Sequence, residues 1–385
     1  MEIQQVQQKF EEIYGAGGEI LSFHSPGRVN LIGEHTDYNG GAVFPCALSF
    51  GTYGVARKRA DNTLNFASTN MDLRVSCTLD DIDFKEEHDW ANYLKGVIVE
   101  FQKLVATLGG LDILISGNIP NGAGLSSSAS VEVLMSVILK TFFAFDIDTV
   151  DMVKLSQRAE NQYIGVNCGI MDQFAIGMGK QEHAILLDCA SLKYEYVPAK
   201  LGDHKLIIAN TNKRRGLADS KYNERRSECD KAVEFLNKEL SIKLLADITP
   251  EQFEQYKYLI TDPVVLKRAE HVIYEIKRTL DAVDTLKAGD IAQFGQLMIG
   301  SHNSLRDLYE VTGIELDTLV AAALEAPGTV GSRMTGAGFG GCTVSVVKSE
   351  CVDDFIKQVD AAYTEKIGYR PSFYIAEIGD GTKQI

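Results

Sequence analysis

Four polar side chains suited to binding a sugar lie within ten residues of one another near the start of the chain. Arg28, Glu34, His35 and Asp37 belong to the segment GRVNLIGEHTDYNGG at residues 27–41. A carbohydrate hydroxyl both donates and accepts hydrogen bonds, so carboxylates suit it as acceptors, and a neutral imidazole can take either role. The alternative is a solvated turn, because Asp, Asn and Gly are ordinary turn residues. The composition of this segment alone leaves both interpretations open.

A second segment, GNIPNGAGLSSSAS at residues 117–130, follows a predicted strand and precedes a predicted helix. Glycines let backbone N–H groups face a ligand, and a helix N-terminus adds partial positive charge, so the pattern favours a phosphate site. A serine hydroxyl in such a loop can also ligate Mg²⁺. The segment is neither a Walker A loop nor a dinucleotide-binding GxGxxG, because it has no lysine and residue 127 is serine. The alternative is a plain helix N-cap.

Two further segments are ambiguous when they are considered one at a time. The segment GSRMTGAGFGG at residues 331–341 has five glycines in eleven residues and precedes a predicted strand that begins at Thr343. It could allow a ligand close to the backbone, and it is equally typical of a wide hairpin or a bulged turn. Asp172 lies among apolar residues in the segment CGIMDQF at residues 168–174. The residue types favour a helix cap there, and the alternative is a functional carboxylate.

The composition excludes several classes of protein. A length of 385 residues suggests two domains or one large one. A formal net charge of −15 makes the chain a poor binder of nucleic acid or of an anionic membrane.

The polar N-terminus does not read as a secretory signal, and the longest apolar stretch, residues 133–145, is too short to span a bilayer. Seven scattered cysteines without a C-x-x-C pair indicate cytoplasmic free thiols, and nothing suggests zinc.

Short apolar runs alternate with helical patterns along the chain, which favours an α+β or α/β fold. Strands are predicted at residues 111–115, 184–187, 205–209, 343–347 and 373–375. Helices are predicted at residues 131–143, 150–163, 219–239 and 264–286. The pattern is least regular over residues 240–263. It changes near residues 203–212, which divides the chain into an N-terminal domain of residues 1–205 and a C-terminal domain of residues 206–385.

Taken together, these segments resemble the galactokinase branch of a superfamily of small-molecule kinases that also contains homoserine, mevalonate and phosphomevalonate kinases. Residues 27–38 are similar to the galactokinase signature nearly letter for letter, and residues 168–174 also resemble galactokinases. Residues 117–130 resemble the phosphate loop of the superfamily, and residues 331–341 resemble its C-terminal glycine-rich motif. The similarity runs from about Ser25 to Cys342, which is most of the chain.

The resemblance implies an α+β protein of two domains. The N-terminal domain would contain a ribosomal-protein-like mixed sheet, the C-terminal domain would be ferredoxin-like, and the active site would lie in the cleft between them. The implied reaction is the transfer of a phosphoryl group from ATP to the anomeric hydroxyl of α-D-galactose, the entry step of galactose catabolism. We expect a cytoplasmic protein, as the cysteines indicate, that is a monomer and whose partners are its small-molecule substrates.

The resemblance also implies roles for single residues. Asp172 would be the catalytic base, and Arg28 would lie beside it, where a guanidinium favours the ionised carboxylate and stabilises the transferred phosphoryl group. Ser128 and Glu160 would hold Mg²⁺. The implied sugar ligands are Glu34, His35, Asp37, Gly169 and Tyr222. The implied ATP-binding residues are Ser68, Gly122, Ala123, Gly124, Leu125, Ser126, Ser127 and Ser128, and the segment around Trp90 could also contact adenine.

Two alternative functions follow from the same resemblance. One is a related kinase that phosphorylates N-acetylgalactosamine or arabinose at the anomeric position. The other is a galactose sensor without catalytic activity, which binds sugar and ATP and contacts a regulator of transcription. Such sensors lack a Ser-Ala pair in the phosphate loop, and Ser128-Ala129 is present here, so the sequence favours the enzyme.

Overall fold

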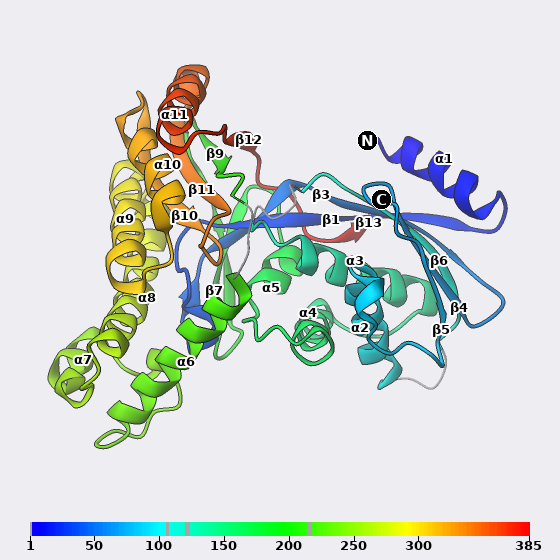
Figure 1. The fold of residues 1–385 in the computed structure, drawn as a ribbon, viewed down its shortest axis with the longest axis horizontal. Coiled ribbons are helices and arrows are strands. Elements are labelled where there is room, and N and C mark those ends of the chain that lie inside the picture. The colour runs from blue at the N-terminus through cyan, green and yellow to red at the C-terminus, as the bar shows by residue number, and fades with distance from the viewer. Residues whose placement is uncertain (1, 105–107, 120–123, 214–217) are drawn as a thin grey trace.

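The computed structural model describes residues 2–104, 108–119, 124–213 and 218–385. These residues form two domains, each built from a sheet with helices packed against it (Figure 1). This is the two-domain α+β arrangement that the sequence predicts. None of the described helices is both long enough and apolar enough to cross a membrane.

The N-terminal domain is built on a six-stranded mixed sheet with the strand order β13-β1-β3-β6-β4-β5. Only the β4–β6 pairing is parallel. Successive residues of a strand face opposite sides of the sheet. On one face Val55 and Leu114 contact α1 (Ile3–Tyr14). On the other face Ala56 and Ile113 pack against three helices, α2 (Ala91–Gln102), α3 (Ser127–Phe143) and α4 (Thr149–Arg158). The strands are β1 (Ile20–Asn30), β3 (Pro45–Lys58), β4 (Thr63–Ser68), β5 (Val75–Thr78), β6 (Leu111–Gly117) and β13 (Lys383–Gln384).

A small three-stranded sheet supports the helix α5 (Met171–Met178). Its strands, in the order β2-β7-β8, are β2 (Ala42–Val43), β7 (His183–Asp188) and β8 (Tyr194–Pro198). Phe174 of α5 is fully buried against Val43, Ile185 and Leu187. This apolar packing fixes the helix that carries Asp172.

The C-terminal domain contains a four-stranded antiparallel sheet with the order β10-β11-β9-β12. This order and the helices between the strands are those of a ferredoxin-like domain. The strands are β9 (His204–Asn210), β10 (Thr329–Thr335), β11 (Cys342–Lys348) and β12 (Ser372–Ala376). The helices are α6 (Ala218–Leu236), α7 (Pro250–Tyr256), α8 (Pro263–Ala288), α9 (Ile291–Ser304), α10 (Gly313–Glu325) and α11 (Val352–Ile367). In Figure 1, α8 to α11 stand at the end of the molecule opposite α1.

Short helical turns complete the described structure. Two are π-helices, η3 (Ala159–Ile164) and η6 (Leu305–Tyr309). The others are 3-10 turns, namely η1 (Asp37–Asn39), η2 (Glu86–His88), η4 (Leu245–Asp247), η5 (Lys257–Leu259) and η7 (Ser349–Cys351). The helix predicted over residues 150–163 is therefore α4 followed by the π-turn η3, and the irregular stretch at residues 240–263 holds η4, α7 and η5.

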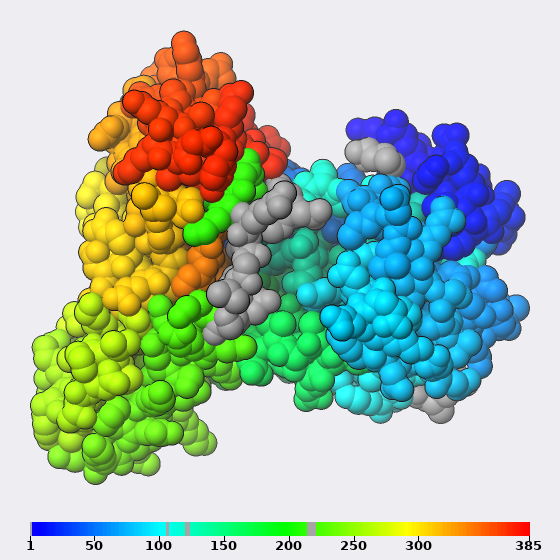
Figure 2. Space-filling model, in the orientation of Figure 1, coloured from blue at the N-terminus to red at the C-terminus, as the bar shows by residue number. Residues whose placement is uncertain are grey.

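The chain crosses between the two domains twice. The boundary that we propose between residues 205 and 206 lies at the start of β9, which opens the C-terminal sheet. After β12 the chain returns, and Gln384 of β13 pairs with Phe23 of β1. In the space-filling view the two domains form two lobes with a hollow between them (Figure 2).

Candidate active site

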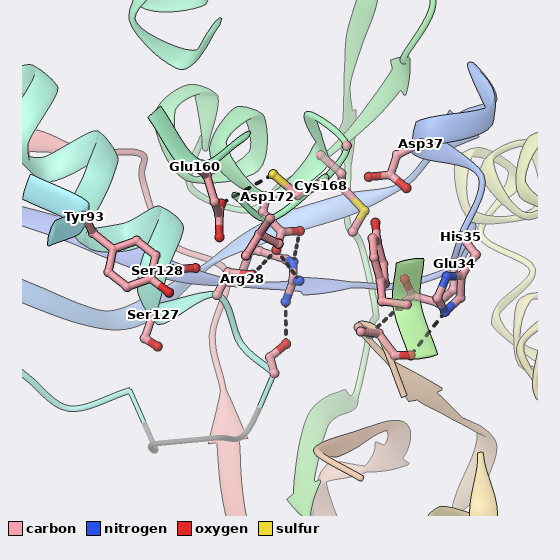
Figure 3. Close-up of a pocket in the computed structure, with 18 residues that line it drawn as sticks. Arg28, Glu34, His35, Asp37, Tyr93, Ser127, Ser128, Glu160, Cys168 and Asp172 are labelled. Carbon is pink, nitrogen blue, oxygen red and sulfur yellow. Dashed lines mark hydrogen bonds and ion pairs between the residues drawn. The ribbon is translucent and has the colours of Figure 1, made fainter. Parts of the chain in front are cut away.

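A cavity of about 300 Å³ lies where the N-terminal domain meets α6 and the β10–β11 connection (Figure 3). Its lining residues come from both domains. Arg28, Glu34, His35, Asp37, Tyr93, Gly124, Ser126, Ser127, Ser128, Glu160, Val166, Cys168, Gly169, Met171, Asp172, Tyr222, Gly336 and Ala337 line it. The cavity therefore brings together nearly all of the described residues that the sequence assigns to sugar, phosphate and metal.

Arg28 and Asp172 form a two-point ion pair inside the cavity. The Arg28 Nε atom donates to Asp172 Oδ1 at 2.8 Å, and Nη2 donates to Oδ2 at 2.7 Å. The register between β1 and β3 shifts between Pro26 and Arg28, which is an irregularity of the kind that redirects a strand side chain. Burial, the largest single effect, lowers the pKa of Arg28, but the charge and hydrogen bonds of Asp172 together with the charges of Glu34 and Asp37 raise that pKa above its usual value.

Asp172 is not a helix cap. It is the second residue of α5, and the cap position, Ile170, makes no side-chain cap hydrogen bond. The prediction that Asp172 caps a helix, which the residue types favoured, is therefore wrong. The carboxylate is bound by Arg28 and by the Ser126 hydroxyl instead. Its side chain is 30% exposed, toward the cavity, so the carboxylate is held in place and is still accessible.

The phosphate loop leads directly into α3. Ser126 occupies the N-cap position with a left-handed φ of 61°, but its side chain donates to Asp172 Oδ2 rather than capping the helix. The N–H groups of the first turn are thus without a side-chain cap at the edge of the cavity, where a helix N-terminus favours an anion. The Leu125 side chain is buried, and its carbonyl accepts from the Arg28 N–H at 3.2 Å. Gly122 and Ala123 lie outside the described residues.

Ser128 and Glu160 place two oxygen atoms of the kind that ligate metal ions side by side, next to this loop. The Glu160 carboxylate accepts a hydrogen bond from the Ser128 hydroxyl and another from Gln173 Nε2 at 2.6 Å. Glu160 sits in the π-turn η3, a local departure from α-helix that is frequent at functional sites. Burial, followed by the charge of Asp172, raises the pKa of Glu160 to about 7.

The surroundings of this pair fit a divalent cation. Glu132 is fully buried next to Glu160, and burial raises its pKa well above the usual range. The Glu132 Oε1 and Gln173 Oε1 atoms have no hydrogen-bond partner among the described residues. Within that part of the chain no three His, Cys, Asp or Glu side chains cluster as metal ligands. Two protein oxygens suit Mg²⁺ that is bound chiefly through substrate phosphates and water.

The end of the cavity that holds the residues assigned to the sugar is crowded around Asp37. Gly169 approaches it so closely that a Cβ atom there would lie 1.8 Å from Asp37 Oδ2. Burial, followed by the charge of Asp172, raises the pKa of Asp37 to about 7. Tyr222 of α6 completes this wall, with its ring 5.7 Å from that of His35. The five residues assigned to sugar therefore share one cavity.

His35 has protein partners on both ring nitrogens. Its Nδ1 lies 2.9 Å from the Tyr38 hydroxyl, and its Nε2 lies 3.2 Å from the carbonyl oxygen of Ala337. A carbonyl only accepts, so Nε2 carries the proton and Nδ1 accepts from Tyr38. Burial lowers the pKa of His35 to about 3, so the ring is neutral. A sugar contact through a ring nitrogen would have to displace one of these partners.

Ser68 and the Trp90 side chain do not line this cavity. Ser68 ends β4 and lines a separate pocket of about 250 Å³ together with Thr69 and Arg74. Trp90 precedes α2 and is buried, and its Nε1 has no hydrogen-bond partner among the described residues. Tyr93, one turn further along α2, reaches the cavity instead. The assignment of Ser68 to ATP stays a prediction.

Sequence reasoning missed several residues of the site. Tyr93 and Val166 carry no pattern that marks them out, and Met171 is marked only as part of the segment at residues 168–174. Gly336 and Ala337 lie in the third glycine-rich segment, which is in part the hairpin between β10 and β11 and in part a wall of the cavity. Cys168 was quoted only as part of a motif, and its Sγ lies 3.5 Å from Glu160 Oε2.

The fold and the cavity define a small-molecule kinase of the GHMP class. Residues 92–180 match the model of the GHMP kinases N terminal domain, and residues 282–364 match that of the GHMP kinases C terminal domain. Residues 8–58 match the galactokinase galactose-binding signature. A solved mevalonate kinase has the same fold, with a TM-score of 0.66 and 18% identity over 94% of this chain and 100% of that chain.

Curated relatives narrow the class to one family. A galactokinase from Fusobacterium nucleatum is 59% identical over 98% of both chains, and one from Bacillus subtilis is 53% identical over 98% of this chain and 97% of its own. The solved structure of Lactococcus lactis galactokinase complexed with galactose matches with a TM-score of 0.97 and 45% identity, covering 100% of both chains. The chain belongs to the galactokinase family.

Proposed function

We propose that this enzyme transfers the γ-phosphoryl group of ATP to the anomeric hydroxyl of α-D-galactose, giving galactose 1-phosphate and ADP. The observation that carries this proposal is the position of Asp172. Its carboxylate is fixed by Arg28 and Ser126, between a helix N-terminus suited to phosphate and a group of side chains suited to sugar hydroxyls.

In this account Asp172 is the general base. It takes the proton from the anomeric hydroxyl while the bond from that oxygen to the γ-phosphorus forms and the bond to the bridging oxygen of ADP breaks. Arg28 holds the carboxylate in place through two hydrogen bonds and offers positive charge near the transferred group. Phosphoryl transfer depends mainly on positioning and charge stabilisation, so no covalent nucleophile is needed.

The remaining roles follow from the two ends of the cavity. Glu34, His35, Asp37, Gly169 and Tyr222 would bind the sugar, and the segment that ends in Ser126, Ser127 and Ser128 would bind the phosphates of ATP. Ser128 and Glu160 would hold Mg²⁺, which supplies charge neutralisation for the phosphates when it is bound. The seven cysteines are all free, which supports a reducing compartment, and we propose a cytoplasmic monomer.

A sugar panel with ATP and Mg²⁺ tests this function. We expect ADP release with galactose, and a product that has lost its reducing end because the anomeric hydroxyl is phosphorylated. A pocket built to hydrogen-bond a hydroxyl can reject an analogue with the wrong contact by up to ~10⁴ in kcat/KM, so glucose should be a poor substrate. A kcat/KM that is higher for N-acetylgalactosamine or arabinose than for galactose would identify a related kinase. Binding of galactose without ADP release would identify a sensor.

A further inference from the structure

Arg333 is a fully buried arginine that does not itself line the cavity. It lies in β10, within the third glycine-rich segment, and none of its side chain is exposed. A guanidinium cannot lose its proton in a protein, and burying its charge is costly unless partners surround it. The identity of those partners therefore indicates what the residue does.

Two partners of Arg333 lie in the segment at residues 27–41, which holds the residues assigned to the sugar. Its Nη1 donates to the Asn30 carbonyl at 3.0 Å and to Glu34 Oε1 at 3.2 Å. The contact with Glu34 joins two side chains that are both almost completely buried. An ion pair with little access to water is weakly screened, so the position of each partner is strongly defined.

The carboxylate of Glu34 is held by one oxygen only. Its Oε1 accepts from Arg333 and also from the Gly336 N–H at 2.8 Å. Among the described residues, nothing donates a hydrogen bond to Oε2, and Glu34 lines the cavity. One oxygen is thus bound within the protein and the other is available to a ligand.

A second chain of contacts fixes the backbone next to Glu34. The Nε atom of Arg333 donates to the Ser301 hydroxyl at 3.2 Å, and that hydroxyl donates to Glu275 Oε1. The same Glu275 oxygen accepts from the Gly33 N–H at 3.1 Å. Strand β10 and helices α8 and α9 of the C-terminal domain therefore hold the sugar-binding segment of the N-terminal domain.

We propose that Arg333 is a positioning residue for sugar recognition. It orients the Glu34 carboxylate so that Oε2 meets a sugar hydroxyl, and it thereby contributes to the discrimination between galactose and sugars that lack that contact. This inference rests on the proposed function, because it assumes that Glu34 binds the sugar. The side chain of Arg333 donates to Asn30, Glu34 and Ser301 and makes no hydrogen bond to Asp172 or to the described residues of the phosphate loop, so we expect its main effect on the sugar.

The test uses Arg333→Lys, which keeps the charge and loses the planar fork. We expect the KM for galactose to rise about tenfold or more, with kcat within about threefold and the KM for MgATP within about twofold of wild type. Combining it with Glu34→Gln in a double-mutant cycle should give a non-additive change in galactose KM, since both changes remove the same interaction. Turnover of galactose by the wild-type enzyme tests the proposed function separately.

Ser332→Ala is the matched control. Ser332 is the neighbouring residue of the same strand and is equally buried, and among the described residues its hydroxyl bonds with that of Ser345 at 2.8 Å. The Ser332→Ala variant should therefore have the same galactose KM as the wild-type enzyme. If Arg333→Lys does not fold, Ser301→Ala should raise the galactose KM in the same direction by a smaller factor. An unchanged galactose KM in the folded variants, an equal rise in both KM values, or additive effects in the cycle would overturn the proposal.

Discussion

The guanidinium of Arg28 binds both carboxylate oxygens of Asp172, at 2.8 Å and 2.7 Å. Its third nitrogen, Nη1, donates to the carbonyl of Gly124 in the phosphate loop at 2.7 Å. One side chain therefore connects the proposed base to the segment that would bind ATP. In the proposed mechanism the mutual position of the two substrates depends on this connection, which makes Arg28 the first residue to test.

Arg28→Lys should reduce kcat by about a hundredfold, because a lysine cannot reproduce the two-point contact with Asp172 or reach Gly124 at the same time. Steady-state kinetics with both substrates saturating would measure this. Arg57→Lys is the matched control, since Arg57 forms a similar pair with Asp112 at 2.8 Å, away from the cavity. Equal losses in the two variants would mean that Arg28 has only a structural role.

Removing the proposed metal ligands should weaken the use of MgATP and spare the sugar. Glu160→Gln and Ser128→Ala should each raise the Mg²⁺ concentration needed for half-maximal rate by about tenfold, because each loses an oxygen donor to a hard cation. Calorimetry should still detect galactose binding. Glu100→Gln, a buried glutamate paired with Arg158 outside the cavity, should leave the Mg²⁺ dependence unchanged. Wild-type turnover of both ligand variants at limiting Mg²⁺ would rule out the assignment.

Gly169→Ala should weaken galactose binding while MgATP binding persists. The new methyl group would lie 1.8 Å from Asp37 Oδ2, so the Asp37 side chain would have to leave its position. We expect the galactose KM to rise at least tenfold. Gly109→Ala is the control, because a Cβ there meets only the Phe143 ring at 3.4 Å, an ordinary contact. If galactose kinetics survive in Gly169→Ala, the close approach of Gly169 to Asp37 is not required.

Asp37→Asn should stabilise the ligand-free enzyme in a pH-dependent way. Burial and the charge of Asp172 raise the pKa of Asp37 from 3.8 to about 7 in the folded protein. The folded state therefore favours the protonated form, and this advantage is lost as the pH rises from about 4 through 7. The gain in melting temperature from Asn should be larger at pH 8 than at pH 5, while galactose binding weakens. An equal gain at both pH values would contradict the shifted pKa.

The sequence predicted those parts of the fold and site that depend on local patterns. The strand at residues 111–115 and the helix at residues 131–143 appear as β6 and α3, because apolar periodicity is a property of neighbouring residues. The start of α3 was also recognisable, since glycines and serines before a helix form a local signal; the binding of phosphate there stays a prediction. The strand β10 was hidden because it lies in a glycine-rich segment. Its one glycine, Gly331, is needed because the strand packs against Gly295 of α9.

The parts that could not be predicted depend on contacts between distant residues. The residue types around Asp172 favoured a cap, and the partner that decides otherwise, Arg28, lies 144 positions earlier in the chain. The contact between Arg333 and Glu34 could not be predicted either, because the two residues are 299 positions apart in the chain. A charged residue inside a glycine-rich segment gives no local indication that it will be buried, because burial depends on the element that covers it.

The central claim is that Asp172 is the base for phosphoryl transfer to galactose. Asp172→Asn keeps the shape of the side chain but removes the carboxylate that accepts the proton. Calorimetry should find galactose and MgATP bound within about threefold of wild-type affinity, while kcat falls by at least about a hundredfold, the contribution of a general base. Turnover within about tenfold of wild type would assign the base to another group, and loss of galactose binding would make Asp172 a sugar-binding residue.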